Sequence, residues 1–256
     1  MKLMVQFATR RRSAHALCPL ALALLAAFLA APSSGSNITQ YIGVDDGAPV
    51  TGPFPASSNS QAMFESAASG LGTLNTITFE SLPVGFQSSF LAAPGVTVTI
   101  NAPNLGSGLS GINNFTLGNT NGFNVTPNGK QWLGFPQGSA TFAFAAGTQS
   151  FGVWLTGTQA SMLSALNFTF DDGQPESLRL PINTNGGAAF SGFVDPGSNI
   201  SSITIVGVGT DAWGIDDVTY NLPPQLALPE PSSVILLATG AAALAGTLRR
   251  KLRYIP

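Results

Sequence analysis

The chain of 256 residues has very few of the side chains on which most enzymes depend. It contains one cysteine, Cys18, and one histidine, His15, and both lie near its N-terminus. If a leader is removed from that end, the remaining chain has no thiol, imidazole or disulfide. Thiol nucleophiles, histidine bases and Cys/His zinc sites are then excluded, and carboxylate pairs remain as the main catalytic option.

A secretory signal peptide is predicted at the N-terminus. Lys2 and the run from Arg10 to Arg12 form a basic segment, and residues 14–31 are mostly Ala and Leu. Small residues follow at 33–36, so we expect cleavage close to Ser36.

Positive charge is scarce away from the two ends of the chain. Between Asn37 and Leu228 there are eleven acidic residues and two basic ones, Lys130 and Arg179, which gives a net charge of −9. A region with this charge repels nucleic acid and anionic lipid headgroups. We therefore expect no nucleic-acid partner, and an acidic domain suited to calcium or to solubility outside the cell.

Three features follow one another at the C-terminus. The first is the motif Pro229, Glu230 and Pro231, which is extended because proline fixes φ and disfavours helix. The apolar stretch from Val234 to Leu248 comes next; as a helix it is roughly 22 Å long, which is short for a hydrocarbon core of about 30 Å. The chain then ends in a basic segment that we expect to remain on the cytoplasmic side, formed by Arg249, Arg250, Lys251 and Arg253.

This tail resembles the PEP-CTERM sorting signal of Gram-negative bacteria, which exosortase membrane enzymes recognise. The resemblance covers Pro229 to Arg253. It implies an exported protein that is transiently anchored in the membrane and processed by an exosortase-type enzyme. It also implies a place at the cell surface or in the extracellular matrix, with exopolysaccharide as a partner. A plain tail anchor is the alternative interpretation.

The region between the two ends predicts a jelly-roll-like β-sandwich. From Leu74 onward, short runs alternate apolar and polar residues, and Gly, Asn, Asp or Pro separate them. About ten short strands at this spacing are typical of such a fold. Stretches such as Phe79 to Leu82 and Gly214 to Val218 also resemble PEP-CTERM ectodomains, which implies a secreted β-sandwich without a settled activity. The expected strands are 75–80, 96–100, 140–144, 151–156, 166–170, 177–181, 188–194, 200–206 and 216–220.

The residues before the sandwich are predicted to be largely irregular. Residues 37–58 are rich in Gly, Pro, Ser and Asp, and Ser60 to Ala68 is the expected short helix, with Asn59 as a cap and Met63 and Phe64 facing the core. The predicted organisation is a signal peptide (1–36), a loop-rich arm with a short helix (37–73), a β-sandwich (74–224) and a sorting tail with an apolar helix (225–256).

Alternation within the predicted strands also selects a core. One side of each strand is apolar, so these side chains are expected to be buried. They are Phe79, Val98, Phe142, Phe144, Val153, Phe168, Phe170, Phe193, Ile203 and Ile205.

A metal site is a further expectation. Glu80 follows an early strand, whereas Asp216 and Asp217 lie in the last one, and first and last strands of a jelly roll are often neighbours. Carbohydrate-binding modules of this shape commonly hold a structural calcium between an early Glu and a late Asp. The chain is similar in that placement, which implies a possible calcium at Glu80, Asp216 and Asp217, with backbone carbonyls and Asp211 as further ligands. In the alternative interpretation, the acids only cap strand ends.

Strand alternation places Asp216 and Asp217 on opposite faces. Ile215 and Thr219 are expected on the side of Asp217, and Val218 and Tyr220 on the side of Asp216.

The other acidic and aromatic candidates are interpreted as structural. Acidic residues in tight turns are usually solvated turn-formers, and tryptophans in strands usually pack in the core. These candidates are Asp45, Asp46, Asp171, Asp172, Glu176, and, as a possible sugar-stacking platform, Trp132, Trp154 and Trp213.

Two classes of function remain. The first is a non-enzymatic, exported surface or matrix protein. The second is a carbohydrate-binding, or less favourably a carbohydrate-cleaving, secreted β-sandwich, and cleavage would require two carboxylates that face each other across a groove.

Overall fold

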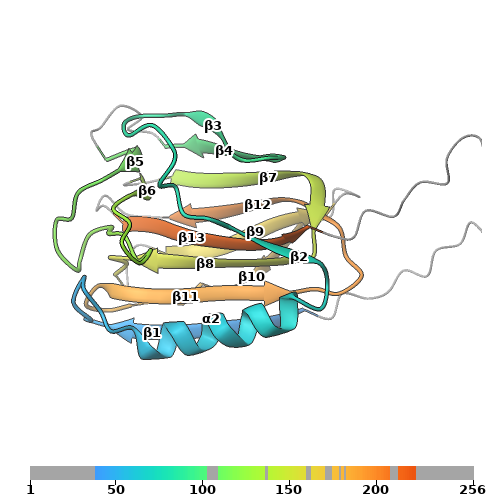
Figure 1. Cartoon of the computed structure of the whole chain (residues 1–256), viewed down its shortest axis with the longest axis horizontal. Helices are drawn as coiled ribbons and strands as arrows, with labels where there is room; N and C mark the ends of the chain where they lie inside the picture. The colour runs from blue at the N-terminus through green and yellow to red at the C-terminus, as the bar shows by residue number, and fades with distance from the viewer. Residues whose placement is uncertain are drawn as a thin grey trace, which may run out of the picture. The chain divides into compact units, whose positions relative to one another are not determined.

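The computed structural model describes residues 38–102, 109–135, 138–159, 163–170, 175–178, 180–181, 183–207 and 213–222. These residues form two antiparallel β-sheets and a helix (Figure 1). The prediction of an all-β sandwich with a helix near its N-terminal side is therefore confirmed.

Sheet A has seven strands and runs β1-β11-β8-β13-β6-β5, with β2 also paired to β13. The long last strand β13 makes this possible, because its first residues pair with β6 and its last residues pair with β2. The bounds are β1 (Thr39–Asp46), β2 (Thr73–Ile77), β5 (Gly111–Asn113), β6 (Trp132–Phe135), β8 (Ser150–Thr156), β11 (Gly187–Val194) and β13 (Trp213–Leu222).

Sheet B has six strands in the order β10-β9-β12-β7-β4-β3. Its strands show the predicted alternation most clearly in β4, where buried and exposed residues follow each other strictly. The bounds are β3 (Ser89–Ala93), β4 (Val96–Asn101), β7 (Gly138–Thr148), β9 (Leu163–Phe170), β10 (Pro175–Leu178) and β12 (Ile200–Gly207).

The main core lies between the two sheets and contains the predicted side chains that the structure describes. Each of them is at most 5% exposed. They are Phe79, Val98, Phe142, Phe144, Val153, Phe193, Ile203 and Ile205. The side chains of Phe168 and Phe170 lie outside the described residues.

Sheet A is covered on both faces, which explains why β8 and β11 are buried at every position. Helix α2 (Pro55–Ala68) packs on the face opposite the main core, where Phe64, Trp154 and Phe190 form a second apolar cluster. In Figure 1 the helix runs along β1 and β11.

Two glycines allow the helix to approach the sheet closely. Gly152 and Gly192 face each other across β8 and β11. A Cβ atom on Gly152 would lie 2.7 Å from ring atoms of both Phe64 and Phe190, and one on Gly192 would lie 2.9 Å from the same two rings. Because these two glycines have no Cβ atoms, the Phe64 ring has room to pack against the sheet.

The predicted irregular arm is wrong for Thr39–Asp46, which forms the edge strand β1 and pairs with β11 over its full length. Pairing with β11 makes this segment a strand, although its local composition does not predict one. The helix also begins earlier than predicted, at Pro55, and Asn59 is not its cap. Of the two residues expected to face the core, Phe64 is buried, but Met63 is 55% exposed.

The predicted signal peptide and sorting tail, including Pro229 to Pro231 and the basic end, lie outside the described residues. Within the part of the chain that the structure describes, no helix has the length and apolar character needed to span a membrane.

Candidate functional site

A β-bulge in β13 brings the predicted acidic residues together. The register between β13 and β8 shifts between Asp216 and Thr219, and Asp217 has a φ of +41°. As a result, Ile215, Val218 and Tyr220 all belong to the main core. The predicted strict alternation is therefore wrong at this point, because the bulge changes its phase.

Asp216 is fully buried and binds the backbone of a loop. This loop, residues 123–131, is called the clamped loop below. Oδ2 of Asp216 accepts hydrogen bonds from the backbone N–H groups of Val125 at 2.7 Å and Thr126 at 3.2 Å. Oδ1 accepts the backbone N–H of Asp217 at 2.9 Å. Both carboxylate oxygens are thus held by peptide donors.

Asp217 and Glu80 hold the same loop from two further points. The hydroxyl of Thr126 donates to Oδ1 of Asp217. Oε1 of Glu80 accepts the backbone N–H groups of Lys130 and Gln131, each at 2.7 Å. The two ends of the clamped loop are therefore fastened to acids that lie far from it in the sequence.

Local backbone geometry allows Glu80 to reach the loop. Phe79, directly before Glu80, has a φ of +62°, which is unusual for a residue with a side chain. Gly129 has no Cβ, and an added one would lie 2.4 Å from Oε1 of Glu80. We did not identify the clamped loop from the sequence, although its Pro127, Asn128 and Gly129 are typical turn residues.

Burial and neighbouring acids change the electrostatics of Asp216 and Asp217. Burial raises the pKa of Asp216 well above the ordinary aspartate value, and the charge of Asp217 raises it further. Burial also raises the pKa of Asp217; the hydrogen bond from Thr126 opposes this shift, and the charges of Glu80 and Glu65 add to it. The structure therefore brings Glu80, Asp216 and Asp217 into one region, as the sequence predicted.

Two further acids bind peptide N–H groups in the same way. Asp45 accepts the N–H groups of Ala56 at 3.1 Å and Ser57 at 2.8 Å, and so caps helix α2 from strand β1. Asp46 accepts those of Thr184 at 2.7 Å and Asn185 at 2.8 Å, and its pKa is lowered chiefly by the bond from Asn185. Both acids order specific segments, which the sequence did not predict; Asp46 is also exposed next to a turn, as predicted.

The carboxylates are poorly arranged for the predicted calcium ion. Calcium requires about six to eight oxygen ligands. Both oxygens of Asp216 instead face N–H donors, and among the described residues no group of three or more His, Cys, Asp or Glu side chains could hold a metal. Asp211, Asp171 and Asp172 lie outside the described residues. Calcium at Glu80, Asp216 and Asp217 stays a prediction that the described geometry does not support.

The three tryptophans do not form an exposed platform. Trp132 and Trp213 are 0% exposed, and Trp154 is 4% exposed. The interpretation of all three as packing residues is confirmed.

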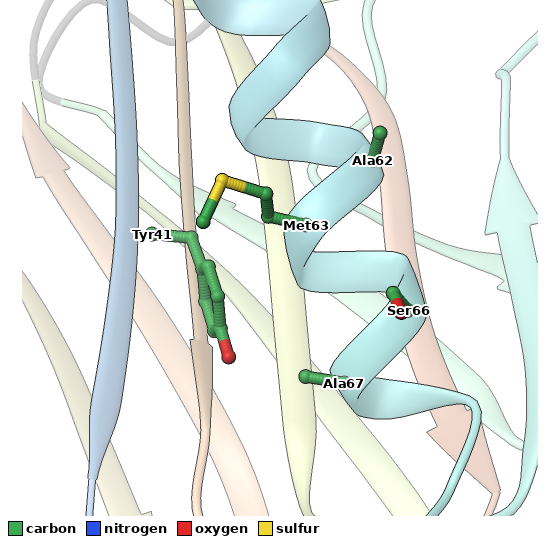
Figure 2. Close-up of a pocket in the computed structure, with 5 residues that line it drawn as sticks. All are labelled: Tyr41, Ala62, Met63, Ser66 and Ala67. Carbon is green, nitrogen blue, oxygen red and sulfur yellow. The ribbon is translucent and has the colours of Figure 1, made fainter.

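A shallow groove lies between β1 and α2 on the outer side of sheet A. It has a volume of about 490 Å³ and is lined by Tyr41, Ala62, Met63, Ser66 and Ala67. Figure 2 shows Met63 and the Tyr41 ring on facing sides of this groove. None of the five side chains is a carboxylate, so these residues provide no carboxylate pair for glycoside cleavage.

Comparisons with known proteins identify no family for this chain. No family model matches it, and no curated protein matches it. Among solved structures, it is similar to the CBM22-1–GH10 modules of a Clostridium thermocellum endo-1,4-beta-D-xylanase complexed with xylohexaose, at 12% identity and a TM-score of 0.30, over 57% of this chain and 28% of the other. It is also similar to the enzymatically active domain of tailspike protein 4 of bacteriophage CBA120, at 16% identity and a TM-score of 0.26, over 59% of this chain and 19% of the other. The chain thus spans less than a third of the length of either structure, and both likenesses are weak.

Proposed function

We propose that this protein is a non-enzymatic, exported component of the cell surface or extracellular matrix, processed by an exosortase-type enzyme and associated with exopolysaccharide. The observation that carries the non-enzymatic part is the use of its acids. Asp45, Asp46, Glu80 and Asp216 each accept at least two backbone N–H groups. A carboxylate held in this way fastens a segment and has fewer lone pairs free to act as a base or nucleophile.

Export and processing are supported by the sequence at both ends. The basic and apolar leader favours secretion, and the order of motif, apolar stretch and basic end favours exosortase processing after Pro231. After processing, the protein would leave the membrane and stay at the surface or in the matrix.

The strand connections support a jelly-roll type of sandwich. Several consecutive strands lie in different sheets, as in the steps from β7 to β8, from β8 to β9 and from β10 to β11. Such crossing between sheets is a property of jelly rolls.

A carbohydrate-binding module is the second candidate. The observation that favours it is a polar sheet face with almost no charge among its described residues, described in the next section. Carbohydrate cleavage is less favoured, because it requires one carboxylate to act as acid and another as base or nucleophile about 5 to 10 Å away. The charge of Glu80 contributes to the raised pKa of Asp217, but both side chains are hydrogen-bonded to the clamped loop.

Intact-mass measurement of the protein released from the cell surface tests the processing step. We expect a mature form that lacks the segment after the Pro229–Pro231 motif. Replacement of Glu230 by Ala, or of both motif prolines by Ala, should leave the tail attached. A matched control changes Pro223 and Pro224, which lie upstream of the motif, and should be processed normally. A native mature form that still ends at Pro256 would leave the tail-anchor interpretation in place.

A further inference from the structure

A continuous row of polar, uncharged side chains crosses the outer face of sheet B. Directly paired residues of an antiparallel sheet share a face, so the register identifies the members of the row. The pairs are Ser89 with Thr99, Thr99 with Thr141, Thr141 with Thr204, Thr204 with Asn167, and Asn167 with Ser177. The row therefore has one member on each of the six strands.

Hydrogen bonds within two pairs confirm that the paired side chains point to the same side. The hydroxyls of Ser89 and Thr99 are 3.2 Å apart, and those of Thr141 and Thr204 are 2.8 Å apart. All six members are at least partly exposed. Helix α2 packs against strands of sheet A.

A second row lies beside the first and is less polar. Leu91 pairs with Thr97, Thr97 with Ala143, and Ala143 with Ser202. Leu91 is 63% exposed. Rows on one face lie about 6.7 Å apart along a strand, and neighbouring strands lie about 4.8 Å apart. The face thus presents hydroxyls in one row and mainly methyl groups with some hydroxyls in the next.

Charge is almost absent from this sheet. Among the described residues of its six strands, Glu176 is the only charged one. This contrasts with the net charge of −9 between Asn37 and Leu228. A polyanion would need cationic groups to bind here, and the described strands of sheet B contain none.

We propose that the outer face of sheet B binds an extended neutral polysaccharide, a proposal that rests on the association with polysaccharide put forward above. Sugar hydroxyls are both donors and acceptors, and so are the Ser and Thr hydroxyls of the first row. The apolar C–H groups of a sugar ring match the methyl groups of the second row. The six-strand width provides repeated contacts along one chain, so individually weak hydrogen bonds add up.

The test is binding of the full-length chain, purified in detergent, to immobilised cellulose, curdlan and mannan, with alginate as the uronic-acid comparison. The triple variant Thr99→Val, Thr141→Val and Thr204→Val keeps the side-chain shape and removes three central hydroxyls. It should bind the neutral polymers more than about tenfold more weakly than the unchanged protein. The control variant Thr39→Val with Thr73→Val removes exposed hydroxyls from sheet A and should bind normally.

The outcomes separate this proposal from the more general one. Normal binding by the triple variant would overturn the assignment to sheet B but leave the association with polysaccharide intact. Binding to alginate alone would overturn the neutral class of ligand. Binding to none of the four polymers would overturn both this proposal and the association with polysaccharide, whereas export and processing are decided separately by intact mass. If the triple variant unfolds at a lower temperature than the unchanged protein, the single variant Thr99→Glu replaces it in the binding measurement. Thr99 is exposed, and its replacement by Glu should also weaken binding to the neutral polymers.

Discussion

The backbone N–H of Val125 donates a 2.7 Å hydrogen bond to Oδ2 of Asp216, which lies 91 residues further along the chain. This contact joins the clamped loop to the last strand of sheet A. It also illustrates how the acidic domain uses its charge: where basic side chains are scarce, peptide N–H groups are the partners of its carboxylates. Such bonds are stronger than those between neutral groups.

Replacement of Asp216 by Ala should destabilise the protein by roughly 2 to 5 kcal/mol, because it leaves the N–H groups of Val125, Thr126 and Asp217 without their acceptor. Urea unfolding measures this loss. The control Ser58→Ala changes an exposed position of helix α2 and should change stability by less than about 0.5 kcal/mol. Equal midpoints for the two variants would show that the clamped loop contributes nothing to stability.

The pH dependence of stability should carry opposite contributions from Asp217 and Asp46. A raised pKa in the folded state means that the folded protein holds the proton more tightly. The contribution of Asp217 is therefore present at pH values below the ordinary aspartate pKa and is lost as the pH rises through the folded-state value. Asp46 has a lowered pKa, so its contribution is present above the ordinary value and is lost as the pH falls through the folded-state value.

Unfolding free energies measured from pH 3 to pH 7 test these signs. As the pH rises toward neutral, the unchanged protein should lose the contribution of Asp217, and the Asp217→Asn variant should not show this decrease in unfolding free energy. As the pH falls toward 3, the unchanged protein should lose the contribution of Asp46, and the Asp46→Asn variant should not show that decrease. Identical pH profiles for the wild type and both variants would contradict the assignments.

Gly152→Ala should destabilise the protein by roughly 1 to 3 kcal/mol, since the added methyl group overlaps the Phe64 and Phe190 rings. Because these rings hold helix α2 on sheet A, the added group should also loosen the helix. Thermal unfolding followed by circular dichroism measures the effect. Gly70→Ala is the matched control, since a Cβ there meets Ala67 at an ordinary 3.5 Å. Recovery of stability on adding Phe64→Leu to Gly152→Ala would locate the strain at that ring.

Thermal melts with calcium and with a chelator test the metal site predicted from the sequence. A bound calcium would raise stability by RT ln(1 + [L]/Kd), or about 2.7 kcal/mol at a hundredfold excess over Kd. We expect equal melts, because the oxygens of Asp216 already face N–H donors. A calcium-dependent rise that Glu80→Ala or Asp217→Ala removes would reinstate the calcium interpretation.

The secondary structure was predictable where each strand shows its own periodicity. Strand β4 is the clearest case, because its apolar residues alternate with Thr97, Thr99 and Asn101, and every second residue is buried. Strand β1 was missed because its order comes from pairing with β11, which no local pattern reports. The phase of β13 was wrong after Ile215 because a bulge inserts an additional residue that alternation does not reveal.

Composition and local periodicity alone limit the chemistry that is open to this chain. The sequence showed that the central region has no Cys or His, carries eleven acids against two bases, and contains enough alternating strands for a two-sided β-domain. It also indicated that Glu80, Asp216 and Asp217 belong together. These properties depend on composition and on local periodicity, and both can be obtained from the linear chain without its fold.

The roles of those acids and the position of the polar face depend on contacts between distant segments. The partners of Glu80 and Asp216 in the clamped loop lie 50 to 91 residues away, so no local pattern identifies them as N–H donors. Likewise, Ser89, Thr141 and Thr204 join one row only once six strands take their register. Both results arise from long-range strand pairing, which depends on the packing of the whole domain and not on any single segment.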